Sequence, residues 1–219
     1  MIQAAIFDLD GLMVDSEPIS HQAWLQVLAP YGAGLSEQQY QRLIGIHLER
    51  SSAIVAQWTG VPLTPPMLAE RHDETILNLF AAGLEPMPGL LALIEALQGH
   101  GLALGVASNS LTHYVEQALQ AVGLRAHFGS LVGVDQVANG KPAPDVFLAA
   151  AAGLGVAPER CLAFEDSPIG AQAAVAAGMR CLAIPSAALV DLDFSVASAR
   201  YDSLADVLPD LERWLGDEG

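Results

Sequence analysis

The stretch Ala4-Ala-Ile-Phe-Asp-Leu-Asp-Gly11 decides the fold of this chain. An apolar run ends there in two carboxylates, Asp8 and Asp10, and a glycine follows at once. A carboxylate at the end of a buried segment is costly unless it is solvated, hydrogen-bonded or paired with a cation. The stretch therefore predicts a buried strand whose carboxyl end carries two acids placed for chemistry.

Composition limits the partners of the protein. The 219 residues are 52% hydrophobic, which is enough for one large domain or for a domain with a smaller insertion. The formal net charge of −16 repels nucleic acids and anionic membranes, so we expect neither as a partner. A small phosphorylated metabolite can still bind if a divalent metal ion and a few well-placed hydrogen-bond donors make the local electrostatic potential positive.

Two cysteines and the absence of a targeting pattern bear on location. Cys161 and Cys181 each lie in an apolar run and form no metal-ligand spacing, so we expect buried, reduced thiols. No basic region followed by a long apolar segment opens the sequence, and no run reaches transmembrane length. We expect a cytoplasmic protein that is a monomer or a weak dimer.

Short apolar runs alternate with helical patterns along most of the chain. Four runs end in polar groups and a fifth ends at a proline; they span residues 2–7, 102–107, 131–134, 161–164 and 181–184. Helical patterns span residues 88–98, 112–122, 144–152, 168–177 and 204–215. This alternation predicts an α/β fold with a doubly wound parallel sheet. Ligands of such sheets bind beyond the carboxyl ends of the strands, where Asp8, Ser108, Glu165 and Asp166 stand.

The segment 17–83 breaks the alternation. It reads as four helices, at residues 18–28, 36–43, 48–58 and 65–82, with Thr64 as the N-cap of the last one. We therefore expect a catalytic core formed by residues 1–16 and 84–219, and an inserted helical cap at 17–83 that acts as a lid.

Four motifs in order make the family resemblance specific. They are Asp8-Leu-Asp10-Gly11 with Val14-Asp-Ser-Glu-Pro18, Ser108-Asn109, Gly140-Lys141-Pro142, and Phe164-Glu165-Asp166-Ser167. With them the chain resembles the haloacid dehalogenase-like hydrolases (the HAD superfamily), in the branch with a small helical cap that includes beta-phosphoglucomutase and sugar-phosphate phosphatases. The resemblance spans nearly the whole chain, and its single lysine, Lys141, falls at the lysine position of the family.

The resemblance implies a two-step phosphoryl transfer. Asp8 would attack the phosphoryl group and form an aspartyl-phosphate. Asp10 would protonate the leaving oxygen and then take a proton from the incoming water. The cofactor implied is Mg²⁺, held by a carboxylate oxygen of Asp8, the backbone carbonyl of Asp10 and Asp166, with Glu165 either binding the ion directly or lying behind it.

The same resemblance implies the groups that hold the phosphoryl oxygens. These would be Lys141, the hydroxyl of Ser108, and backbone amides near Leu9 and Asn109. Simpler interpretations stay open for the neighbouring residues. Ser108–Ser110 and Asp166–Ser167 are also helix-start patterns, and Asp135 either orients Lys141 or ends a strand.

The expected cap departs from beta-phosphoglucomutase. His21 lies one residue beyond the histidine position of that enzyme, and we interpret it as a surface or packing residue. The lysine and arginine that flank the mutase glycine are replaced by Ile44 and Leu48, and Arg42, His47 and Arg50 are either solvated or a substitute anion site.

These differences favour a Mg²⁺-dependent phosphatase of a small, sugar-phosphate-like metabolite. The nearest alternative is a phosphomutase of the beta-phosphoglucomutase type. A non-catalytic phosphoacceptor switch is disfavoured by Asp10 and by the cap.

Overall fold

The computed structural model describes residues 1–186 and 189–216 and divides the chain into two compact units. The first unit comprises Met1–Val14 and Glu85–Gly219, and the second comprises Asp15–Leu84. Within the described residues, no helix is long and apolar enough to cross a membrane.

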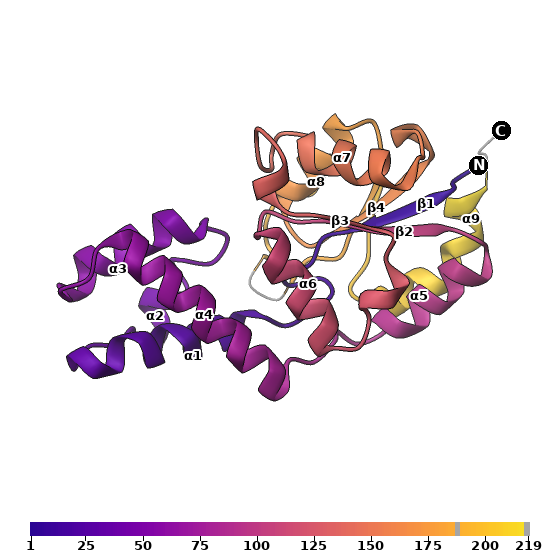
Figure 1. Cartoon of the computed structure of the whole chain (residues 1–219). Helices are drawn as coiled ribbons and strands as arrows, with labels where there is room; N and C mark the ends of the chain where they lie inside the picture. Colours follow the sequence, from indigo (N-terminus) through magenta and orange to yellow (C-terminus); the bar gives the residue numbers. More distant parts are fainter. Residues whose placement is uncertain (187–188, 217–219) are drawn as a thin grey trace. The chain divides into compact units, whose positions relative to one another are not determined.

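A parallel six-stranded sheet forms the centre of the first unit, which confirms the predicted α/β fold class (Figure 1). The strands are β1 (Ala4–Phe7), β2 (Ala103–Ala107), β3 (Ser130–Val132), β4 (Cys161–Glu165), β5 (Arg180–Ala183) and β6 (Ala199–Arg200). Their order is β3-β2-β1-β4-β5-β6. The chain therefore winds outward from β1 in both directions, and the order reverses beside β1, where ligands of such sheets bind.

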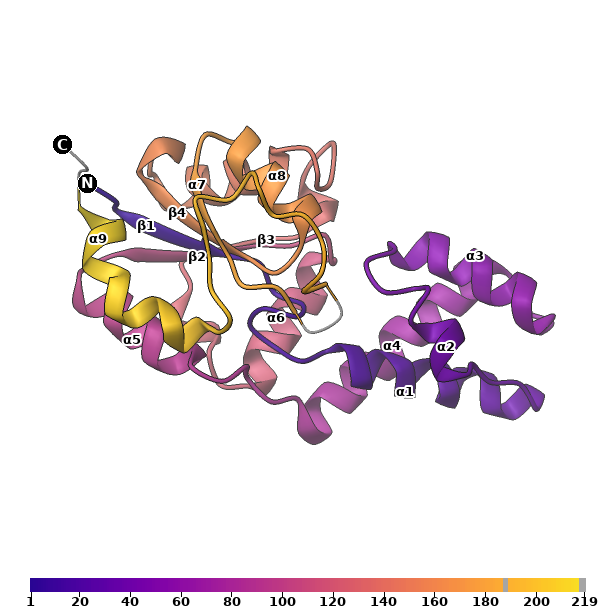
Figure 2. The ribbon, with the colours of Figure 1, turned by 180° about the vertical axis from the view of Figure 1, so that it is seen from behind.

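Helices cover both faces of this sheet (Figures 1 and 2). One face carries α7 (Asp145–Leu154) and α8 (Pro168–Ala176), and the other carries α5 (Leu90–Gly99), α6 (Thr112–Ala121) and α9 (Leu211–Leu215). Double coverage explains why the strands are nearly continuous apolar runs rather than alternating ones. All four residues of β1 are buried, and the Phe7 ring stacks on Phe164 of β4 at 4.6 Å between centroids. Cys161 and Cys181 are buried and form no disulfide.

The sequence predictions were wrong at the C-terminal end of this unit. The segment 204–215 is not one α-helix: Leu204–Asp210 is a 3₁₀-helix that contains Pro209, and only Leu211–Leu215 is α-helical. Proline lacks the backbone donor that an α-helix needs at an interior position. The strand β6 was missed because two paired residues carry no readable apolar pattern.

The second unit is helical, with α1 (Glu17–Leu28), α2 (Glu37–Tyr40), α3 (Leu48–Thr59) and α4 (Pro65–Gly83). The helix predicted over 36–43 is therefore one turn, closed by a capping box between Ser36 and Gln39. Thr64 occupies the N-cap position of α4, but its side chain makes no capping hydrogen bond. The buried core of the unit includes Trp24, Leu28, Val55 and Leu68.

His21 is a packing residue of this unit, as its sequence context suggested. Its ring stacks on Tyr40 at 4.6 Å between centroids. The Nδ1 atom lies 3.2 Å from Glu37, and Nε2 lies 3.2 Å from the carbonyl oxygen of Leu35.

His72 makes the second unit sensitive to pH. Its ring lies 4.3 Å from that of Trp24, Nε2 lies 3.2 Å from the carbonyl oxygen of Ser20, and Nδ1 is buried with no hydrogen-bond partner among the described residues. Burial lowers the pKa of His72 from 6.5 to about 4. The unfolded chain therefore binds a proton as the pH falls below 6.5, whereas the folded chain does so only near 4, so stability is lost across that window.

We expect His72 to remove about 2 kcal/mol of unfolding free energy between about pH 7 and about pH 5. Urea unfolding followed by tryptophan fluorescence measures it, with His72→Gln as the variant that cannot titrate. His100→Gln is the control, because His100 pairs with the exposed Glu212. Wild type and His72→Gln losing stability in parallel would contradict the assignment.

Candidate functional site

Asp8 is held in place by the neighbouring strand. It directly follows β1, and its backbone N–H donates to the carbonyl oxygen of Phe164 at 2.9 Å. Because Phe7 pairs with Phe164 in the parallel register, Asp8 lies beside Glu165 at the carboxyl edge of the sheet. The sheet thus places two carboxylates from distant parts of the sequence side by side.

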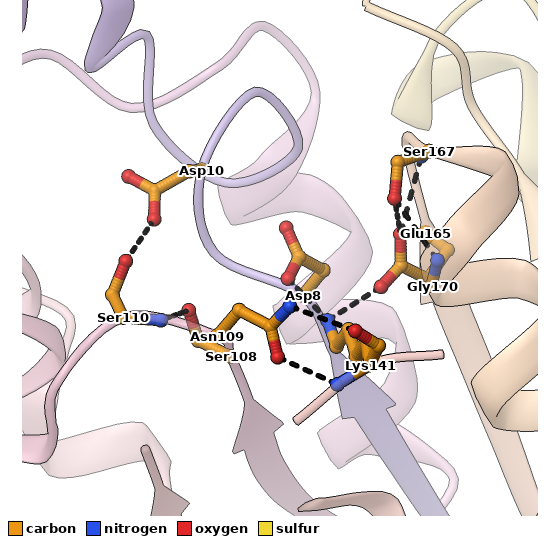
Figure 3. Close-up of polar contacts among 9 residues, drawn as sticks. All are labelled: Asp8, Asp10, Ser108, Asn109, Ser110, Lys141, Glu165, Ser167 and Gly170. Carbon is orange, nitrogen blue, oxygen red and sulfur yellow. Dashed lines mark hydrogen bonds and ion pairs between the residues drawn. The ribbon is translucent and has the colours of Figure 1, made fainter. Parts of the chain in front are cut away.

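Lys141 bridges these two carboxylates (Figure 3). Its Nζ atom lies 2.5 Å from Oδ1 of Asp8 and 2.5 Å from Oε1 of Glu165. The lysine side chain is only 4% exposed, and Nζ lies 5.0 Å from the centre of the Phe147 ring. The only lysine of the chain therefore pairs with two acids of the site, which uses two of its three N–H donors.

Glu165 is fixed on both sides. While Oε1 accepts from Lys141, Oε2 accepts from the backbone N–H of Ser167 at 3.1 Å and from its hydroxyl at 3.0 Å. Gly170 leaves room for this carboxylate, because a Cβ atom at that position would overlap it. The Ser167 hydroxyl also accepts from Gly170 N–H, which caps α8.

Asp166 completes a cluster that could hold a metal ion. Asp8, Glu165 and Asp166 are all buried, and each offers an oxygen within 4.8 Å of the others. The loop after β1 packs closely on Asp166, since a Cβ atom at Gly11 would overlap its Oδ2 atom. Gly11 also has a φ of +81°, which side chains rarely adopt.

The charges of the site do not balance. The pKa of Asp8 is raised to about 7, chiefly by burial and also by the charges of Glu165 and Asp10, against the opposing charge of Lys141. Burial and the charges of Asp8 and Glu165 also raise the pKa of Asp166 well above its usual range. Burial disfavours the Lys141 ammonium, but Asp8 and Glu165 outweigh this and raise its pKa. Three buried carboxylates face one ammonium, so the donor set fits a divalent cation with oxygen ligands.

Asn109 ties two loops of the site together. Its side-chain oxygen accepts from the backbone N–H of Lys141 at 2.7 Å, and its amide group donates to the Lys141 carbonyl at 3.3 Å. Gly140 permits this approach, because a Cβ atom there would lie 2.8 Å from the Asn109 oxygen. Ser108, which directly follows β2, is buried, and its Oγ accepts from Ser110 N–H at 3.0 Å.

Asp10 has partners that the sequence analysis did not identify. Its Oδ2 accepts from the hydroxyl of Ser110 at 2.8 Å, and its Oδ1 accepts from the hydroxyl of Tyr114 at 2.9 Å. In Figure 3 the Asp10 side chain turns toward Ser110 and away from Lys141. The sequence signal for Ser110 was its place two residues after the Ser108 motif, whereas Tyr114 carried no signal.

The structure differs from two interpretations of the sequence, the role of Asp135 and the helix-start pattern at residues 108–110. Asp135 does not contact Lys141 but caps α6, accepting from Thr112 N–H at 2.7 Å and from its hydroxyl at 2.8 Å. The N-cap residue of α6 is Leu111, so the 108–110 segment does not cap the helix. Arg42, His47 and Arg50 lie in the second unit, and Leu9 lies two residues beyond β1 in the first.

Comparisons with known proteins identify the relatives of this chain. The model of the haloacid dehalogenase-like hydrolase family matches residues 5–184. The fructose-1-phosphate phosphatase YqaB of Escherichia coli is 37% identical over 175 residues, which cover 80% of this chain and 92% of that protein. Hexitol phosphatase B of Escherichia coli is 34% identical over 212 residues, which cover 94% of each chain.

A solved structure has a similar fold over most of the chain. The crystal structure of CbbY from Rhodobacter sphaeroides in complex with phosphate matches with a TM-score of 0.85 and 29% sequence identity. The match covers 94% of this chain and 96% of that one.

Proposed function

Since this chain belongs to the haloacid dehalogenase-like hydrolases, we propose that it is a Mg²⁺-dependent phosphatase of small sugar phosphates that works through an aspartyl-phosphate. One observation carries the proposal. Asp8, at the end of the central strand, shares a buried cluster with Glu165 and Asp166 and is paired with Lys141 at 2.5 Å. This arrangement offers a carboxylate nucleophile together with the positive charge that its attack on a phosphate requires.

Asp8 attacks the phosphorus atom while the bond to the sugar oxygen breaks. Asp10 donates a proton to that oxygen, and the alcohol leaves. Water then attacks the aspartyl-phosphate, Asp10 takes the proton of the water, and the bond between Asp8 and phosphorus breaks. The products are the free sugar and inorganic phosphate.

The acidic cluster is the proposed metal site. Asp8, Asp166 and the backbone carbonyl of Asp10 would hold Mg²⁺, which draws charge from the phosphoryl oxygens when bound. Glu165 holds Lys141 through Oε1 and Ser167 through Oε2, and it would either bind the ion directly or lie behind the ligands.

The positive and polar groups around Asp8 hold the phosphoryl oxygens. Lys141 and the Ser108 hydroxyl supply side-chain donors, and the backbone amides of Leu9 and Asn109 supply two more. Since the Asn109 side chain binds the main chain of Lys141, we assign it to fixing the lysine loop.

The helical unit Asp15–Leu84 is proposed to act as the lid over this site. It enters the sequence directly after the Asp8 loop and returns just before α5, so two linkers connect it to the sheet unit. A lid excludes bulk water during phosphoryl transfer and opens to release the products. Its side chains would select the alcohol that leaves.

A substrate panel tests the function. We expect release of inorganic phosphate from hexose 1-phosphates or hexitol phosphates and from p-nitrophenyl phosphate, with EDTA abolishing the activity and Mg²⁺ restoring it. We choose these sugar phosphates because the chain resembles a fructose-1-phosphate phosphatase and a hexitol phosphatase. Isomerisation of beta-glucose 1-phosphate without phosphate release would overturn the choice in favour of a phosphomutase.

A further inference from the structure

Two side chains of the segment that follows β2 donate hydrogen bonds to the two carboxylate oxygens of Asp10. The Ser110 hydroxyl donates to Oδ2 at 2.8 Å and the Tyr114 hydroxyl donates to Oδ1 at 2.9 Å. Two donors on opposite oxygens set both the direction and the plane of a carboxylate. Because a carboxylate has about four acceptor positions, these two donors alone do not exhaust its capacity.

The segment that carries these two donors is itself held in place by hydrogen bonds. Tyr114 lies in the first turn of α6, whose start is tied to Asp135 through the N–H and hydroxyl of Thr112. The carbonyl oxygen of Ser110 accepts from Val134 N–H at 3.0 Å, and this bond ties the loop before α6 to the segment after β3. Because Tyr114 stands on the first turn of a helix whose start is held in place, its backbone position is fixed. Its hydroxyl can therefore set the orientation of the Asp10 carboxylate.

We propose that Tyr114 is a positioning residue for proton transfer by Asp10. The inference rests on the proposed function, in which Asp10 passes a proton to the leaving oxygen and later takes one from water. Tyr114 exchanges no proton in either step; its hydroxyl remains a hydrogen-bond donor that keeps the carboxyl group aligned. Without the Tyr114 hydroxyl, only Ser110 of these two donors still holds the carboxyl group, so the plane of the Asp10 carboxyl group can rotate.

The effect of misalignment depends on the leaving group. A sugar alkoxide is a poor leaving group and needs a proton as the bond to phosphorus breaks. The p-nitrophenolate ion is a good leaving group and departs without one. General acid catalysis contributes about 10²–10⁴-fold where it is needed, so misplacing the acid slows the sugar phosphate far more than the aryl phosphate.

Tyr114→Phe tests the inference through kcat/KM, which reports the steps up to departure of the leaving group. We expect kcat/KM to fall about tenfold or more for the best sugar phosphate and less than about threefold for p-nitrophenyl phosphate, a differential that follows from the leaving-group dependence of acid catalysis. The melting temperature should change little, because the ring stays. An equal fall for both substrates indicates a structural role and overturns the inference, as does the absence of a fall for either substrate.

The matched control is Tyr201→Phe in the same unit. The Tyr201 hydroxyl also donates to an aspartate, Asp210, at 2.8 Å, and it accepts from the indole of Trp214 at 2.7 Å. This variant should keep the wild-type ratio of the two kcat/KM values.

Two further measurements separate this inference from the proposed function. Wild-type protein that hydrolyses neither substrate with Mg²⁺ refutes the proposed function and the inference with it. If wild type is active and Asp10→Asn is selectively slow on the sugar phosphate, but Tyr114→Phe keeps the wild-type ratio, only the role of Tyr114 is refuted.

Discussion

Asp8→Asn is expected to lower kcat by about 1,000-fold or more while the protein stays folded. An asparagine amide has almost the shape of the aspartate but does not attack phosphorus. Asp8 is one of three buried carboxylates, and burial already disfavours its charge, so removing that charge relieves repulsion from Glu165 and Asp166. We therefore expect a melting temperature in EDTA equal to or above that of the wild type.

Steady-state phosphate release and thermal unfolding together check this prediction. Asp206→Asn is the control, because Asp206 accepts a hydrogen bond from Ser203 on the exposed surface and lies outside the site. It should keep wild-type kcat. An Asp8→Asn enzyme with substantial activity would refute the nucleophile assignment.

Lys141→Met is expected to lower both activity and stability. In the proposed mechanism Lys141 donates to the transferring phosphoryl group, so we expect kcat to fall about 100-fold or more when the ammonium is lost. It also leaves Asp8 and Glu165, both buried, without their 2.5 Å partner. Removing one partner of a buried ion pair destabilises a protein by about 3–5 kcal/mol, so the unfolding free energy should fall by that amount near neutral pH.

The loss of stability caused by Lys141→Met should depend on pH. The loss should shrink as the pH falls, because the carboxyl groups then take up protons and no longer need the ammonium. Urea unfolding in EDTA at two pH values measures it. Arg125→Met is the control: Arg125 pairs with Glu116 at 3.3 Å with both side chains about half exposed, and its removal should cost less than about 1 kcal/mol. Equal stability of wild type and Lys141→Met would contradict the role of Lys141 as the counter-charge.

Much of the architecture could be predicted because strand ends carry local signals. The fold class is confirmed, and the apolar runs ending at Asp8, Ser108 and Glu165 are strands of the sheet. Since parallel strands bring their carboxyl ends to one edge, the meeting of Asp8 with Glu165 followed from the strands alone. The meeting with Lys141 followed from the family motif.

Other features depend on contacts that no pattern encodes. Glu165 and Asn109 both hold Lys141, one through its ammonium and the other through its main chain, and neither spacing nor composition indicates this. Tyr114 reaches Asp10 across 104 positions of sequence. In the segment 204–215, Pro209 shifted the first part to a 3₁₀-helix, which the apolar spacing did not reveal.

The central claim is that Asp8 carries the phosphoryl group during turnover. Its most direct test is a single-turnover reaction with excess enzyme, quenched in acid within the first turnover, followed by borohydride reduction and peptide mass spectrometry. We predict that the peptide containing Asp8 carries the reduced residue in the wild type and not in Asp8→Asn. Release of phosphate at the normal rate with no modification at Asp8, or with modification at another residue, would contradict the account.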